Sequence, residues 1–133
     1  LLGVGNSLNT SAEPLNTNPR IAFSHESSNS GPLTIFVKRT VGVGAAKPDL
    51  DTGVTPVAGV PLHFVFEWAS STSMTVSILD NAGASLFTTT YTGALEVPIS
   101  TGVLFHPFIR FNNFFIGSGV VGHFFGASFS YTR

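Results

Sequence analysis

The clearest indication of the fold is an alternating pattern in Leu62-His63-Phe64-Val65-Phe66-Glu67-Trp68-Ala69. Large apolar side chains stand at every second position from Leu62 to Trp68. This period of two matches a β-strand, whose successive side chains point to opposite faces, and a helix cannot satisfy it. We therefore predict a strand with one face, including Trp68, in a core and with Glu67 pointing outward.

The next segments continue the same pattern. Residues 74–79 alternate Met74, Val76 and Ile78 with polar or small positions, after a turn at residues 70–72. Asp80-Asn81-Ala82-Gly83 has the composition of a tight turn, and a Thr-rich, β-branched strand is predicted over residues 86–92. Consecutive strands joined by such turns indicate antiparallel hairpins.

The rest of the chain also favours strands, and no stretch predicts a helix of convincing length. Residues 1–18, rich in Asn, Ser, Thr and Gly, are predicted to be an N-terminal arm or irregular lead-in, and residues 19–133 a single domain. We expect roughly eight to ten strands in an all-β sandwich. Besides those above, strands are predicted over residues 21–24, 33–37, 50–54 (short, in a Gly-rich loop), 95–99 (carrying Pro98 at an edge or strand end), 104–111 and 124–131.

Composition excludes several classes of function. The chain has 133 residues, no cysteine, 10% charged residues and a formal net charge of −1. Without cysteine there is no disulfide, thiolate metal site or thiol nucleophile. Six scattered basic residues do not form the patch that a nucleic-acid partner requires, and no apolar run is long enough to span a membrane. Low charge favours a homo-oligomer or a particle subunit.

Three stretches carry a resemblance to a known family: residues 51–62, residues 64–68 and residues 72–83. Together they resemble the concanavalin-like (laminin-G-type) jelly roll, in which a DTG and AG lead-in precedes a strand of alternating aromatics, a TS turn and a hairpin. Residues 107–113 and 129–133 look like its later strands. The resemblance implies an antiparallel jelly-roll β-sandwich, found in bacteriophage spikes and fibres and in carbohydrate-binding or adhesive proteins.

Catalytic and metal-binding groupings are weak in this sequence. Glycosidases use two facing carboxylates, whereas the strand predicted over residues 62–69 carries a single one, Glu67. Asp49, Asp51, Asp80 and Asn81 could supply calcium ligands, but turn roles explain them better. The four histidines lack metal-binding spacing. We therefore predict no enzyme activity, no cofactor and no metal site.

Two surfaces are predicted from the aromatic and amide residues. Sugar recognition combines a flat aromatic face with polar side chains. Adjacent Phe residues on one strand place a ring on each face, so a subunit interface is expected to cover the outer ring. The predicted ligand-binding residues are Tyr91, Arg110, Asn112, Asn113 and Tyr131, and the predicted interface residues are Phe111, Phe114, Phe115, Phe124 and Phe125.

The sequence as a whole predicts a non-enzymatic structural or adhesive surface protein that self-assembles, such as a phage-type capsid decoration, spike or fibre domain, at a virion surface or outside the cell. One alternative is a lectin-like carbohydrate-binding module that contacts surface glycans. Another is a pilus-like filament subunit whose residues 1–18 are donated to a neighbour's sheet edge.

Overall fold

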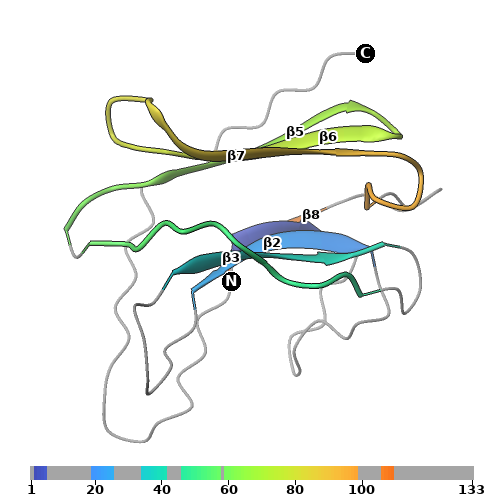
Figure 1. Cartoon of the computed structure of the whole chain (residues 1–133), viewed down its shortest axis with the longest axis horizontal. Helices are drawn as coiled ribbons and strands as arrows, with labels where there is room; N and C mark the ends of the chain where they lie inside the picture. The colour runs from blue at the N-terminus through green and yellow to red at the C-terminus, as the bar shows by residue number, and fades with distance from the viewer. Residues whose placement is uncertain are drawn as a thin grey trace, which may run out of the picture.

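The structure, a computed structural model, describes residues 2–5, 19–25, 34–41, 46–57, 59–98 and 106–109, with residues 2–5 and 106–109 described by their backbone alone. These residues form two antiparallel β-sheets and no helix, which confirms the all-β prediction at this level (Figure 1). Among them there is also no helix with the length and hydropathy needed to cross a membrane. The strands are β1 (Leu2–Gly5), β2 (Arg20–His25), β3 (Ile35–Thr40), β4 (Leu50–Asp51), β5 (His63–Ser70), β6 (Ser73–Leu79), β7 (Ser85–Thr92) and β8 (His106–Ile109).

One sheet has five strands in the order β4-β3-β2-β1-β8. Strand β1 pairs with β2 on one side and with β8 on the other, so its Val4 stands between Ile21 and Pro107. Residues 2–5 thus form a strand within the chain's own sheet, although their composition predicted an irregular lead-in. Pairing on both sides satisfies the backbone amides and carbonyls of this short strand. The composition of the segment gives no information about such pairing partners.

The other sheet consists of three consecutive strands, β5-β6-β7. A hairpin joins β6 to β7, as the sequence predicts for residues 80–83. There Asp80 Oδ1 accepts hydrogen bonds from the backbone N–H groups of Ala82 and Ala84, each at 2.8 Å. Gly83 adopts a φ of 85°, which residues with a Cβ atom rarely reach. The turn therefore fixes the β6–β7 register.

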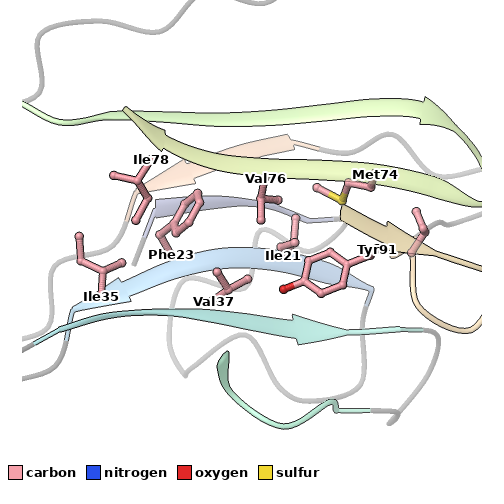
Figure 2. Close-up of a cluster of buried hydrophobic side chains, with 9 residues drawn as sticks. Ile21, Phe23, Ile35, Val37, Met74, Val76, Ile78 and Tyr91 are labelled. Carbon is pink, nitrogen blue, oxygen red and sulfur yellow. The ribbon is translucent and has the colours of Figure 1, made fainter. Parts of the chain in front are cut away.

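The two sheets face each other across one core (Figure 1). Figure 2 shows side chains of β2 and β3 meeting side chains of β6 and β7 between the layers. The Phe23 ring of one sheet lies 5.0 Å from the Phe64 ring and 5.1 Å from the Phe66 ring of the other, measured between centroids. Trp68 packs against the same core, which confirms its predicted inward orientation.

Residues 95–98 differ from the prediction of a short strand. The Glu96 and Val97 N–H groups both donate to the Gly93 carbonyl, at 3.0 and 3.2 Å, so the chain turns instead. Gly93 has a φ of 105°, a conformation that favours glycine and allows the turn to begin there. Pro98 lacks a backbone N–H and therefore cannot donate to a sheet. This turn brings Val97 into the core, where it is fully buried.

Candidate functional site

The outer face of the three-stranded sheet carries an ordered array of hydroxyl groups. Because side chains alternate along a strand, the same pattern that sends Met74, Val76 and Ile78 into the core sends the intervening residues outward. The β6–β7 register pairs these outward residues across the two strands. The pairs are Ser73–Thr92, Thr75–Thr90 and Ser77–Thr88, which we call the hydroxyl ladder.

Hydrogen bonds tie the hydroxyl ladder together. Thr75 Oγ1 and Thr90 Oγ1 lie 2.9 Å apart, and Ser77 Oγ and Thr88 Oγ1 lie 2.8 Å apart. Each such cross-strand pair stabilises a sheet modestly. A serine or threonine nucleophile needs a neighbouring base to remove its proton. These hydroxyls are bonded to one another, so the ladder has the chemistry of a neutral, hydrogen-bonding surface.

Strand β5 continues this face beside the ladder. Glu67 is opposite Thr75 and Val65 is opposite Ser77. Glu67 is exposed, as predicted from its parity. The aromatic residues of β5 have the opposite parity and pack against the core. In the described part of the chain, the outer face of this sheet therefore lacks the flat aromatic platform that sugar-binding sites use.

A second polar cluster joins the two sheets. Arg39 on β3 donates from Nη1 to the Glu96 carbonyl oxygen at 2.6 Å and to Glu96 Oε2 at 2.9 Å. Lys47 Nζ donates to Glu96 Oε1 at 2.6 Å. Hydrogen bonds from Lys47 and Arg39 hold the pKa of the Glu96 carboxyl below its usual value. This cluster fastens the turn after β7 to the strand β3 of the other sheet.

Tyr91, one of the predicted ligand-binding residues, lies beneath this cluster. Its side chain is a member of the core and is only 9% exposed, and Figure 2 shows its ring between the two layers. The Arg39 guanidinium carbon is 3.6 Å from the ring centroid, which is cation–π geometry. Burial raises the pKa of the Tyr91 phenol, and the nearby Arg39 charge opposes that shift. The buried hydroxyl has no hydrogen-bond partner of acceptable geometry among the described residues.

The other predicted ligand-binding and interface residues lie outside the described residues. A contact between them and Tyr91 therefore stays a prediction. The ligand-binding residues in this position are Arg110, Asn112, Asn113 and Tyr131. The interface residues are Phe111, Phe114, Phe115, Phe124 and Phe125.

The carboxylates considered as calcium ligands have local partners. Asp49 lies 3.5 Å from Lys38 Nζ, and Asp51 Oδ1 accepts from the Gly53 N–H at 2.9 Å. Asp80 holds the β6–β7 turn. Over the described ranges, no three side chains of His, Cys, Asp or Glu come together as a metal site.

Sequence reasoning missed the Arg39–Lys47–Glu96 cluster. Arg39 and Glu96 are 57 residues apart in the chain, so no local pattern connects them. The hydroxyl ladder had a signal, because Thr88, Thr90 and Thr92 share one parity within the strand predicted over residues 86–92.

No protein-family model, curated protein or solved structure matches the chain.

Proposed function

We propose that this chain is a non-enzymatic structural or adhesive module that assembles with copies of itself at a virion surface or outside the cell. The observation that carries this proposal is the outer face of the β5–β6–β7 sheet, a largely uncharged surface whose opposite side packs on the shared core. In two of its three cross-strand pairs, Thr75–Thr90 and Ser77–Thr88, the hydroxyl groups bond to each other. Such a surface suits contact and adhesion better than chemistry.

Charge supports self-assembly in particular. Association of identical chains brings like charges together, which opposes assembly when the surface is highly charged. This chain has 10% charged residues and a net charge of −1, so the repulsion between two copies is small. In the part described, Glu96 also forms ion pairs with both Arg39 and Lys47, which compensates part of this charge within the chain.

The finer fold belongs to the same proposal. We propose that the two sheets are part of a concanavalin-like jelly roll. Two features support this assignment: the sheets share one core, and β1 pairs directly with β8, which brings segments about 100 residues apart in sequence into one sheet. A phage-type capsid decoration, spike or fibre domain is the setting that the resemblance of residues 51–83 implies.

Size-exclusion chromatography with light scattering tests the function. The protein should elute as a dimer, trimer or larger species, and the mass should fall on dilution if association is weak. Dispersed monomer at every concentration up to about 1 mM would overturn self-assembly, since weak specific association of proteins falls within that range. In that case glycan-array binding would become the next experiment, because the lectin-like alternative needs no assembly.

A further inference from the structure

The two edges of the three-stranded sheet differ in chemistry. Strand β7 lies at one edge, and in the described part of the chain its only neighbour is β6 (Figure 1). Its eight residues, Ser85–Thr92, include no charged residue and no proline. Edge strands of soluble proteins usually carry lysine, proline or a strong bulge that prevents pairing with another chain. Most of β7 lacks these protections.

Strand β5, at the other edge of the sheet, has two features that oppose pairing with another chain. It carries the exposed Glu67 near its middle, and its pairing with β6 is irregular between Trp68 and Ser70. A carboxylate and a bulge both oppose the addition of a further strand. The irregularity in the β6–β7 pairing lies at the beginning of β7, beside Leu86, and leaves residues 87–92 in regular register.

Side-chain exposure agrees with an open β7 edge. Met74, Val76 and Ile78 on the central strand β6 are fully buried. The inward residues Phe87 and Thr89 of β7 are only half-buried, although they face the same core. Leu86, also on β7, is a large apolar residue with 47% of its surface exposed. An added strand would cover these apolar groups and bond the outward backbone groups of β7.

We propose that β7 pairs with β7 of a second copy, antiparallel and about a two-fold axis through Thr89. Opposite residues in an antiparallel pair share a face, so this register puts Phe87 opposite the partner's Tyr91 and Thr88 opposite the partner's Thr90. It satisfies the requirement that a two-fold interface be complementary to itself. Aromatic pairs on the core side and threonine pairs on the outer side are both favourable across strands.

The chemistry of the hydroxyl ladder supports this occupant over a partner of different sequence. Thr75 already bonds to Thr90 within one chain. In the paired state Thr90 stands beside the second copy's Thr88, which in turn bonds to that copy's Ser77. The row of hydroxyls thus continues without interruption across both copies. The inference deepens the proposed function and rests on it, since it names the surface through which self-assembly occurs.

Charge substitutions on β7 test both whether this edge is the interface and whether the two β7 strands pair in the proposed register. In Thr88→Lys/Thr90→Lys, lysines would stand opposite lysines of the second copy. We expect its dimer dissociation constant to rise by about 100-fold or more, because apposed like charges oppose binding strongly. Thr88→Glu/Thr90→Glu should weaken association equally. An equimolar mixture of the two variants should dimerise again, since lysine then faces glutamate.

The control is Glu67→Gln/Ala69→Lys, which makes the same change of net charge on the outer face of β5. It should assemble like the wild type, and circular dichroism should show that every variant keeps its β-sheet content. If Thr88→Lys/Thr90→Lys associates as tightly as the wild type, the β7 interface is overturned, although self-assembly itself is not. A mixture that stays monomeric, while both variants are folded, also overturns it. A monomeric wild type overturns the proposed function itself.

Discussion

The outer faces of the two sheets differ although both come from alternating strands. On β6 the alternation is complete: Met74, Val76 and Ile78 are fully buried and the residues between them reach the surface. On β2 the side chains of both faces are buried. Ile21 and Phe23 point into the shared core, and Ala22 and Ser24, which point away from it, are each only 2% exposed. Thr40, beside them on β3, is 1% exposed.

The three-stranded sheet therefore exposes its outer face, whereas the middle of the five-stranded sheet is buried on both faces. Small side chains are consistent with a covered face. Gly3 of β1 pairs with Ala22, so two of the smallest residues meet here on the outer face, with Lys38 opposite Ala22 on β3. A face of that kind can receive other chain segments closely, while a hydroxyl-bearing face remains hydrated.

The largest effect is expected where alternation is complete. Ile78→Ala removes a fully buried side chain of the central strand β6 and should lower the free energy of unfolding by about 2–5 kcal/mol, because it leaves a cavity between the sheets. Urea unfolding followed by fluorescence measures this loss. Its neighbour Ser77→Ala, on the outer face, is the control and should change stability by less than about 1 kcal/mol. Equal losses would contradict the assignment of the two faces.

The covered face of the five-stranded sheet gives the next largest effect. Ala22→Leu adds bulk at a position that is 2% exposed and should cost about 1–3 kcal/mol through overpacking. Thr88→Leu adds a leucine to the exposed outer face of the other sheet, and since it loses only the surface hydrogen bond to Ser77 it should cost less than about 1 kcal/mol. Thermal melting of both variants measures the two changes in stability, and a neutral Ala22→Leu would show that the outer face of β2 has room for a larger side chain.

A smaller effect is expected within the hydroxyl ladder. A double-mutant cycle with Thr75→Val and Thr90→Val should give a coupling free energy of about 0.2–1 kcal/mol, since the two hydroxyls lie 2.9 Å apart. The same cycle on Thr75 and Thr88, which are not directly opposite each other, should give a lower value. Comparable couplings would indicate that the hydrogen bond contributes nothing of its own.

The smallest effect concerns the cluster that joins the sheets. The pKa of Glu96 is lowered by hydrogen bonds from Lys47 and Arg39, so its stabilising contribution is present above the ordinary value of 4.5 and is lost as pH falls through the lower folded value. Urea unfolding between pH 7 and pH 3 should show the wild type converging with Glu96→Gln at the acid end. Glu67→Gln, which removes an exposed carboxylate outside this cluster, is the matched control.

The sequence predicts the three-stranded sheet well. Residues 62–92 contain their own turns, and the apolar positions that alternate there do line the core. Both hairpins form between neighbours in the chain, so the information that specifies them is local. The orientation of Glu67 follows from parity alone.

Long-range features could not be predicted in this way. The pairing of Leu2–Gly5 between β2 and β8 depends on strands that are distant in sequence. The contact of Arg39 and Lys47 with Glu96 depends on a turn at residues 93–97, which has the composition of a short edge strand. Residue type alone makes Tyr91 a candidate for sugar binding, yet its parity on β7 is that of Phe87 and the core. Parity therefore predicts orientation better than residue type does.

The two sheets should also differ in how fast they form. Strands β5, β6 and β7 follow one another directly, so each hairpin closes a loop of only a few residues. Hairpins of this kind form within microseconds, whereas strands far apart in sequence pair more slowly. Pairing of β1 with β8 closes a loop of about 100 residues and requires most of the chain to be in place. We therefore expect folding to begin in the β5–β6–β7 hairpins and to end when β1 enters its sheet.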